Sequence, residues 1–207
     1  MNAFRQGLRR YQGAGWPEFA AGVRVGVIGA GGLGSNCAAH LVRSGFSRLV
    51  LADPDTVDAS NLNRQFYRLA QIGLLKVEAL RDNLLAIDPD ADIAIHTLAV
   101  DATNMRELFG SCQAVVEAVD LPDVKKLIME TLVPTGCLVV GASGMGGAGL
   151  AGAMRPRAFG PNCVVVGDHS TACSAATPPL SPGVGMAAAM QADVVLHHFL
   201  NRFQEAL

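Results

Sequence analysis

The sequence has few charged residues and no field of one sign, and this shortage excludes several partners. Charged residues make up only 16% of the 207 residues, against about 25% in an average soluble domain. The net charge is −2. Because no basic excess is available to neutralise phosphates, we expect neither nucleic-acid binding nor attachment to a membrane surface.

Paired cysteines and long glycine-free apolar runs are also missing. The five cysteines form no CxxC pair and are odd in number, so no disulfide scaffold and no structural zinc are expected. The uncharged stretches 25–42 and 137–154 contain too much glycine for a bilayer span, and the first residues lack the apolar run of a secretory signal. Half of the residues are hydrophobic, so the chain can bury a sizeable core. The cysteine pattern and the missing span and signal lead us to expect a reduced cytoplasmic enzyme.

What the sequence does contain is an alternation of short apolar segments with helical patterns. Residues 23–28 are rich in valine and predict a buried strand, and a glycine turn follows at 29–34. Behind the turn, Leu33, Cys37 and Leu41 recur at helical spacing before a second buried strand at 47–53. Strand, turn, helix and strand form a βαβ unit, which predicts a parallel sheet with right-handed crossovers.

The alternation continues beyond this unit. Helix and strand are expected to alternate over residues 71–87, 92–98, 104–109, 113–119, 121–133 and 137–140. The rhythm fails after the glycine-rich segment 141–149. There, 150–154 and 163–166 are expected to be short antiparallel strands, and a last helix covers about 185–203.

No linker interrupts the sequence, so we expect one α/β domain over residues 1–207. Its fold class is Rossmann-like: a mostly parallel sheet flanked by helices, with a short antiparallel C-terminal extension. The expected parts are an N-terminal segment at 1–22, made of a helix and a turn, a core at 23–141, and the extension with its helix at 142–207.

The glycine turn has the spacing of a nucleotide-binding motif. Gly29, Gly31 and Gly34 follow a strand and open a helix, so the backbone can approach phosphate oxygens beside the helix N-terminus. Asp53 stands at the end of the second strand, 24 residues after Gly29, where it would accept hydrogen bonds from ribose hydroxyls. The motif indicates an adenine nucleotide without saying which one.

The following segment favours ATP over a nicotinamide cofactor. A polar block at 60–65 contains Arg64, and Lys76 follows twelve residues later. Each cation alone is typical of a solvated surface. Together, beside a glycine turn, they suit a site that cleaves a triphosphate, because arginine offers a fork of donors to phosphate oxygens and lysine a compact charge.

These segments carry a resemblance to a known family. The motifs GAGGLGSN (29–36), LADPDTV (51–57) and SNLNRQ (60–65), with Lys76, resemble the ThiF/MoeB/HesA family, relatives of the ubiquitin-activating enzymes. The resemblance implies binding of ATP and Mg²⁺, adenylylation of the C-terminal glycine carboxylate of a small ubiquitin-like protein, and release of pyrophosphate. The segment 182–196 is most similar to short ThiF-type proteins of thiamine biosynthesis, whose partner is a ThiS-like sulfur carrier.

The resemblance also implies the site residues. Those expected to bind the nucleotide are Gly29, Gly31, Gly32, Gly34, Asp53, Ser60, Asn61, Arg64, Gln65, Lys76 and Leu121. Arg64, Lys76 and Asp120 are expected to serve catalysis, and Asp120 matches the family's magnesium carboxylate. Leu121 replaces the usual asparagine, so one polar contact is missing. A glycine carboxylate needs no general base, so the lack of an obvious His or Ser triad agrees with catalysis by positioning and charge neutralisation.

Several questions stay open on the sequence alone. Cys173 lies near where some relatives keep a sulfur-handling or thioester cysteine, and is otherwise an ordinary cysteine. Arg5 falls where the family places an arginine that reaches into a partner subunit, although Arg9 or Arg10 would serve as well. A homodimer is expected by resemblance. The segment 141–149 either lines a groove for the carrier's tail or merely crosses the sheet.

Three other functions compete with the leading one. An NAD(P)-dependent oxidoreductase rests on the glycine turn alone. A non-catalytic nucleotide-binding partner subunit is suggested by Leu121 and by the missing zinc cysteines. The same adenylation chemistry could also act on a tRNA base or a peptide, although the acidic balance argues against tRNA.

Overall fold

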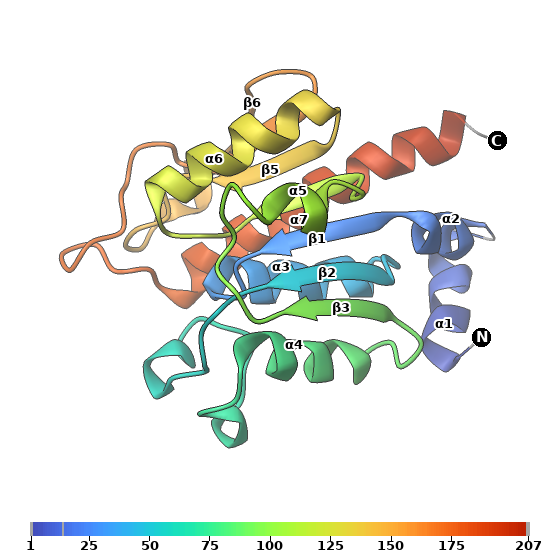
Figure 1. The fold of residues 1–207 in the computed structure, drawn as a ribbon, viewed down its shortest axis with the longest axis horizontal. Coiled ribbons are helices and arrows are strands. Elements are labelled where there is room, and N and C mark those ends of the chain that lie inside the picture. Colours follow the sequence, from blue (N-terminus) through green and yellow to red (C-terminus); the bar gives the residue numbers. More distant parts are fainter. Residues whose placement is uncertain (1, 14, 206–207) are drawn as a thin grey trace.

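A seven-stranded sheet forms the middle layer of the computed structural model, which describes residues 2–13 and 15–205 (Figure 1). Its strand order is β3-β2-β1-β4-β5-β7-β6, and every neighbouring pair is parallel except β6 and β7. The strands are β1 (Arg24–Ile28), β2 (Arg48–Ala52), β3 (Asp92–His96), β4 (Ala114–Glu117), β5 (Leu138–Ala142), β6 (Arg155–Ala158) and β7 (Cys163–Gly167).

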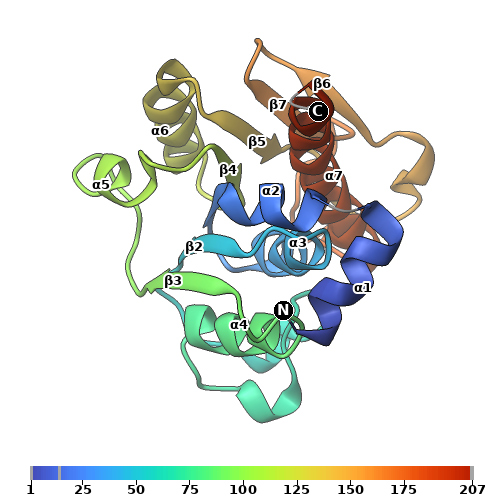
Figure 2. The ribbon, with the colours of Figure 1, turned by 90° about the vertical axis from the view of Figure 1, so that its right-hand side faces the viewer.

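Helices cover both faces of this sheet. They are α1 (Ala3–Gln12), α2 (Trp16–Gly22), α3 (Gly32–Arg43), α4 (Lys76–Leu85), α5 (Met105–Phe109), α6 (Pro122–Leu132) and α7 (Ser181–Glu205). Figure 2 shows α5 and α6 on one side of the sheet and α3 and α7 on the other. The two apolar clusters divide in the same way, since one contains residues of α3, α4 and α7 and the other residues of α5 and α6.

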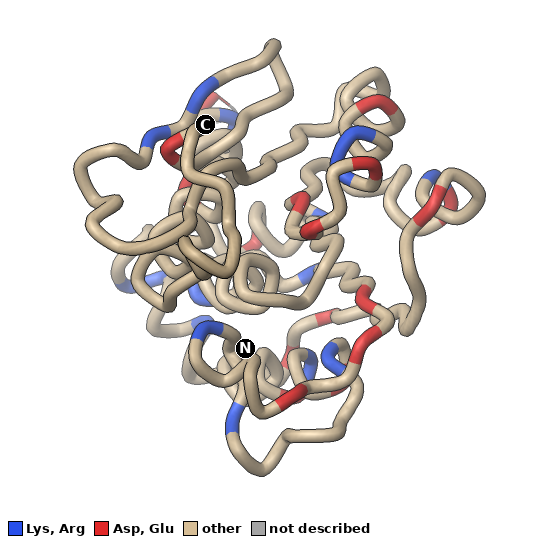
Figure 3. The backbone as a smooth tube through the Cα atoms, turned by 90° about the vertical axis from the view of Figure 1, so that its left-hand side faces the viewer, with Lys and Arg blue, Asp and Glu red and all other residues tan. Residues whose placement is uncertain are grey.

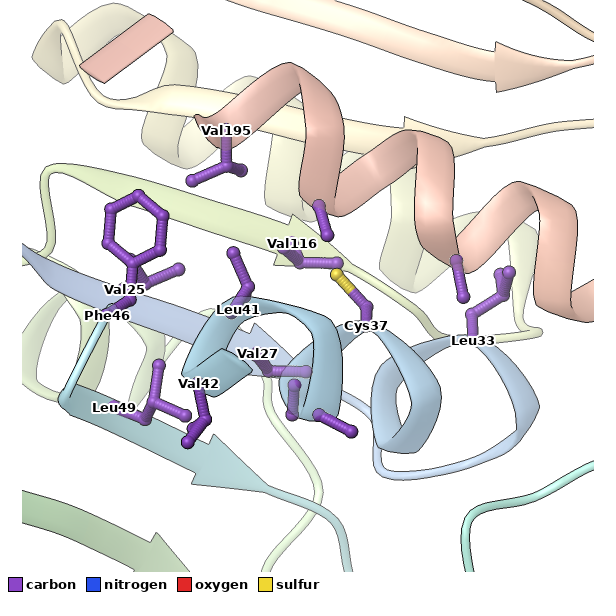
Figure 4. Packing of buried hydrophobic residues seen from close by; sticks show 14 of the residues in the cluster. Val25, Val27, Leu33, Cys37, Leu41, Val42, Phe46, Leu49, Val116 and Val195 are labelled. Carbon is purple, nitrogen blue, oxygen red and sulfur yellow. The ribbon is translucent and has the colours of Figure 1, made fainter. Parts of the chain in front are cut away.

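The apolar residues of β1 explain why this strand lies in the centre. Val25 and Val27 pack against α3 and α7, where Figure 4 shows them near Leu41 and Val195. Ile28 belongs to the cluster on the opposite face. Gly26 is required there, because a Cβ at this position would lie 2.5 Å from the ring of Phe109. A strand buried on both faces has a continuous run of apolar residues, as 25–28 does.

The structure confirms the predicted Rossmann-like, mostly parallel α/β fold with an antiparallel pair at its end. The bounds of one strand at that end were predicted wrongly. The segment predicted as a strand at 150–154 begins with a 3-10 turn, and the strand is Arg155–Ala158 instead. The predicted antiparallel strand at 163–166 is confirmed as β7, which pairs antiparallel with β6 and in parallel with β5. Because β6 is an exposed edge strand, its residues need no apolar alternation, so the pattern misses it.

The ends of two predicted helices were also wrong. The helix predicted from 71 begins only at Lys76, because Thr56 and Leu75 form a bridge that keeps the chain extended up to that point. The last helix begins at Ser181, four residues before the predicted start, since Pro182 is tolerated in a first turn. The N-terminal segment holds two helices rather than a helix and a turn. Among the described residues, no helix combines the length and apolar character that crossing a bilayer requires.

Candidate functional site

The glycine turn lies at the carboxyl ends of the strands, where the strand order reverses between β1 and β4. In open α/β sheets, ligands bind at this switch point. Figure 3 looks onto this end of the molecule, where acidic and basic positions are interspersed without a field of one sign. The turn itself runs from the end of β1 into the first turn of α3.

Two of the glycines are needed by the fold and a third keeps space open. A Cβ at Gly29, where φ is 95°, would lie 2.6 Å from the Ala118 carbonyl oxygen, and one at Gly34 would lie 1.8 Å from the Gly29 oxygen. A Cβ at Gly31 would approach only the side-chain amide of Gln65, at 3.9 Å. Since the first amides of a helix have no partner within it, the turn has donors and room for an anion.

Asp53 fixes the backbone of this turn. It is buried at the end of β2, where its Oδ2 accepts the Ala30 amide at 2.7 Å and its Oδ1 accepts the Asp55 amide at 2.9 Å. Burial raises the pKa of Asp53, and the two amides and the Lys76 charge oppose that rise. The carboxylate therefore lies beside the turn as predicted, and its contact with a ribose stays a prediction.

Lys76 lies beside Asp53, and its predicted contact with the phosphates stays a prediction. It is the first residue of α4 and is buried, with Nζ 2.6 Å from Asp55 Oδ2 and 3.8 Å from Asp53 Oδ1. The Asp55 carboxylate is mostly exposed. A lysine ammonium is a compact charge that can exchange an exposed carboxylate for a phosphate oxygen. Lys76 is thus placed to serve an anion at the turn.

Arg64 extends along the other side of the turn. Its Nη1 donates to the Ser60 carbonyl at 3.1 Å and to Asn63 Oδ1 at 2.8 Å. Within residues 2–13 and 15–205, no carboxylate forms an ion pair with Arg64. Its stem lies 3.6 Å from the position of a Cβ at Gly32. A guanidinium without a carboxylate, beside a helix N-terminus, suits a phosphate.

Ser60 and Asn61 shape the loop in this structure. The Ser60 hydroxyl donates to Asp58 Oδ1 at 2.6 Å, and Asn61 Oδ1 accepts the Asp58 amide at 3.1 Å. Asp58 and Asn61 therefore cap the short 3-10 turn Ala59–Asn61, and the Ser60 hydroxyl holds the Asp58 carboxylate. The predicted phosphate contacts of these two residues stay predictions.

Gln65 has a buried polar atom that a ligand could satisfy. It is only 9% exposed, and its buried Oε1 has no hydrogen-bond partner among the described residues. A buried polar group without a partner is rare in native proteins, because it loses its bonds to water without replacement. A cavity of about 270 Å³ opens here, lined by Asn36, Leu62, Arg64, Gln65, Phe66, Tyr67, Arg68 and Ser181. None of residues 29–34 lines this cavity, so it adjoins the Arg64 loop beside the turn. Because Gln65 Oε1 is an acceptor, it suits a hydroxyl or amino group of a nucleotide rather than a phosphate oxygen.

Two residues of α3 attach the Arg64 loop to the turn. The Ser35 hydroxyl donates to the Gly31 carbonyl at 2.6 Å and accepts the Phe66 amide at 3.0 Å. Asn36 Nδ2 donates to the carbonyls of Gly32, at 2.7 Å, and Arg64, at 2.9 Å. The loop and the turn therefore form one connected unit.

Asp120 and Leu121 lie just beyond β4, on the other side of the switch point. Both are exposed, Leu121 to 61%. No group of three or more His, Cys, Asp or Glu side chains in the described part of the chain could hold a metal ion. Mg²⁺ usually binds through one or two carboxylates together with water and substrate phosphates, so a single Asp120 fits a magnesium ion that arrives with the nucleotide.

Sequence reasoning missed a polar group behind Asp120. The Glu117 carboxylate, at the end of β4, is 1% exposed and accepts from Lys125 Nζ at 2.8 and 3.0 Å. Gln191 of α7 donates to the carbonyls of Glu117, at 2.9 Å, and Val140, at 3.1 Å. Burial raises the pKa of Glu117, and the Lys125 charge opposes the rise. The sequence does carry a sign of this group, because Glu117 is the one carboxylate in the otherwise apolar strand β4.

The N-terminal arginines lie far from this turn within the chain. Helix α1 lies at the amino ends of the strands, opposite the carboxyl ends that bear the glycine turn (Figure 1). Arg5 Nε donates to both oxygens of the buried Asp88, at 3.2 and 2.9 Å, and Arg9 forms an ion pair with Glu18. Of the three candidate arginines, only Arg10 forms no ion pair among the described residues. The expectation that an N-terminal arginine reaches into a partner subunit stays a prediction, and Arg10 is the candidate whose side chain is available for it.

Replacing Arg5 with alanine is expected to lower the free energy of unfolding by about 1–3 kcal/mol, because it removes charged hydrogen bonds from buried Asp88. Urea denaturation measures this loss. Arg10→Ala is the matched control and should leave stability unchanged. If Arg5→Ala instead keeps full stability and loses enzymatic activity, Arg5 serves a site rather than the fold.

Comparison with known proteins agrees with this geometry. The family model described as "ThiF family" matches residues 18–206. The chain is 32% identical over 139 residues to an adenylyltransferase and sulfurtransferase UBA4 of Vanderwaltozyma polyspora, covering 67% of this chain and 32% of that protein. It is 42% identical over 85 residues to ubiquitin-like modifier-activating enzyme 5 of Caenorhabditis elegans, covering 41% of this chain and 20% of that protein. The chain thus spans less than a third of the length of these two relatives.

Solved structures share the fold along the whole chain. The tRNA N6-threonylcarbamoyladenosine dehydratase TcdA of E. coli, in complex with ATP, has a TM-score of 0.89 at 19% identity, covering 99% of this chain and 98% of that one. MccB of E. coli with ATP has a TM-score of 0.74 at 20% identity, covering 96% and 64%. The resemblance found in the sequence motifs is confirmed by the family match over residues 18–206, and the chain belongs to the ThiF family.

Proposed function

We propose that this chain is an ATP-dependent adenylyltransferase that activates the C-terminal carboxylate of a small ubiquitin-like protein. The observation that carries the proposal is the placement of Arg64 and buried Lys76 around one glycine turn, with the unpartnered Gln65 Oε1 nearby. Arg64 has no carboxylate partner among the described residues. The names of the relatives support it, since UBA4 is an adenylyltransferase and ubiquitin-like modifier-activating enzyme 5 acts on a ubiquitin-like protein.

The reaction needs few groups from the protein. A carboxylate oxygen of the substrate attacks the α-phosphorus of ATP, the bond from that phosphorus to the bridging oxygen breaks, and pyrophosphate departs with the electron pair. No proton has to move, because the attacking carboxylate is already ionised at neutral pH. The turn amides, Arg64 and Lys76 hold the phosphates and neutralise the developing charge. Mg²⁺, held by Asp120 and phosphate oxygens, would add further positive charge at the phosphates.

The segment 182–196, which resembles short ThiF-type proteins, supports the choice of carrier and pathway, while the family resemblance supports the dimer and the composition supports the location. We infer a ThiS-like sulfur carrier as the partner, a role in thiamine biosynthesis, a homodimer, and a location in the cytoplasm. The net charge of −2 supports a protein substrate over a tRNA, because a tRNA site needs a basic surface.

ATP–pyrophosphate exchange tests the proposal. The purified chain should exchange label between pyrophosphate and ATP only when an intact ThiS-like carrier is added. The same carrier without its last glycine is the matched control and should give no exchange. If the chain binds ATP but no carrier protein brings about ATP–pyrophosphate exchange, the chain is a non-catalytic partner subunit. Calorimetry that finds NAD⁺ binding and no ATP binding would identify an oxidoreductase.

A further inference from the structure

Tyr67 connects two parts of the candidate site that are far apart in the sequence. It follows the loop that carries Arg64 and Gln65, and its side chain is only 8% exposed. Its hydroxyl oxygen lies 2.7 Å from the Ala30 carbonyl oxygen, in the glycine turn, and 3.3 Å from the Lys76 carbonyl oxygen, at the start of α4. A phenol has one proton to donate, so the shorter contact is the stronger hydrogen bond.

The residue that Tyr67 contacts is held from two sides. The Ala30 amide donates to Asp53 Oδ2 at 2.7 Å, and the Ala30 carbonyl accepts from Tyr67. Ala30 itself is buried. Both polar groups of its backbone are therefore fixed by buried side chains, one from the end of β2 and one from the Arg64 loop.

Fixing the Ala30 carbonyl also fixes the next amide. The carbonyl of Ala30 and the N–H of Gly31 belong to one planar trans peptide unit, so they point in opposite directions. With the carbonyl directed to the buried hydroxyl, the Gly31 N–H is turned away from the core. A Cβ added at Gly31 would meet only the side-chain amide of Gln65, at 3.9 Å. An anion on the turn would approach from that side.

The chemistry of the hydroxyl supports a constant donor. Burial, together with the nearby charge of Asp53, raises the pKa of the Tyr67 phenol well above its ordinary value. The raised pKa favours the protonated phenol, which is the form that donates a hydrogen bond. A donor of this kind can hold the Ala30 carbonyl both before and after a nucleotide binds.

We propose that Tyr67 is a positioning residue: its hydroxyl holds the Ala30 peptide so that the Gly31 amide faces the phosphates of the nucleotide, and it links this turn to the helix that begins at Lys76. The part that concerns the nucleotide rests on the proposed function. The hydrogen bond from Tyr67 to the Ala30–Gly31 peptide unit lies within this chain, so it can be tested without any ligand.

The test compares Tyr67→Phe with Tyr11→Phe. These are the two tyrosines of the chain, and Tyr11 is 88% exposed, so the same atom is removed at a remote site. The phenylalanine ring still fills the space around residue 67, so the fold is kept. Because one hydrogen bond is lost, ATP should bind about 3- to 10-fold more weakly to Tyr67→Phe by calorimetry, and with unchanged affinity to Tyr11→Phe.

Two further measurements separate positioning from a general loss of stability. Ile128→Val removes one buried methylene on the other face of the sheet, and it should leave ATP affinity unchanged at a comparable loss of stability. Hydrogen exchange of the ligand-free proteins should be faster over residues 29–35 in Tyr67→Phe only.

The outcomes keep the two proposals apart. If the wild-type protein does not bind ATP, the proposed function fails. Amide hydrogen exchange over residues 29–35 still tests whether Tyr67 holds the Ala30 peptide. If Tyr67→Phe has the wild-type rate of amide hydrogen exchange over residues 29–35 and the wild-type ATP affinity, the positioning role is overturned. An equal loss of affinity in Ile128→Val would also overturn it, because the effect would then come from stability.

Discussion

Arg64→Ala is expected to lower carrier-dependent pyrophosphate exchange by about 10²–10³-fold, the range found when one preorganised donor is removed from a transition state. Its free energy of unfolding should change by less than about 0.5 kcal/mol. The reason is the placement of the guanidinium, which contacts only the Ser60 carbonyl and Asn63 and has no carboxylate partner among the described residues. Exchange assays and urea denaturation on the same preparations measure both quantities.

Arg81→Ala is the matched control for this prediction. Arg81 lies on α4 away from the turn, with only a long contact to Asp82 at 3.8 Å. Its removal should leave exchange at the wild-type rate. Arg64→Lys should retain part of the activity, since the charge is kept and the fork of donors is lost. Wild-type exchange in Arg64→Ala would remove Arg64 from the catalytic group.

Lys125→Met is expected to lower the free energy of unfolding by about 3 kcal/mol, because it leaves a buried carboxylate without its counter-charge. Glu117 is almost fully buried, and Lys125 contacts both of its oxygens. Urea denaturation at neutral pH measures the loss. The control is the double variant Glu117→Gln with Lys125→Met, which carries no buried charge and should regain most of the stability.

The loss should also depend on pH. Without Lys125 the pKa of Glu117 rises further in the folded protein, above its ordinary value of 4.5 in the unfolded chain. As pH rises through this window the unfolded chain releases its proton first, so stability falls with rising pH. The deficit of Lys125→Met should therefore shrink below about pH 4.5. A deficit that is constant with pH, or a double variant as unstable as the single one, would contradict this account.

Local patterns predicted the centre of the fold because they are strong there. The β-branched run before Gly29 marks β1, and the glycine spacing marks the turn, since backbone contacts at Gly29 and Gly34 exclude any side chain. The edge strand Arg155–Ala158 was not predicted, because an exposed strand has no alternation of apolar and polar residues. The late start of α4 at Lys76 depends on a bridge to Thr56, which no local pattern reveals.

The candidate site was predictable where motifs carry it. Asp53, Arg64 and Lys76 were expected together, and the structure brings all three to the glycine turn. The roles of Tyr67 and Gln191 were not predicted, because their side chains donate to backbone carbonyls of segments distant in the sequence. A carbonyl belongs to every residue and leaves no mark in the sequence, so such contacts become visible only in the fold.

A crystal structure with ATP tests the central claim most directly. We expect the triphosphate to lie over residues 29–34, with Arg64 in contact with its outer phosphates and the Lys76 ammonium moved from Asp55 to a phosphate oxygen. Phosphates found away from the turn, with the Arg64 guanidinium still on Asn63 and Lys76 still paired with Asp55, would contradict the account.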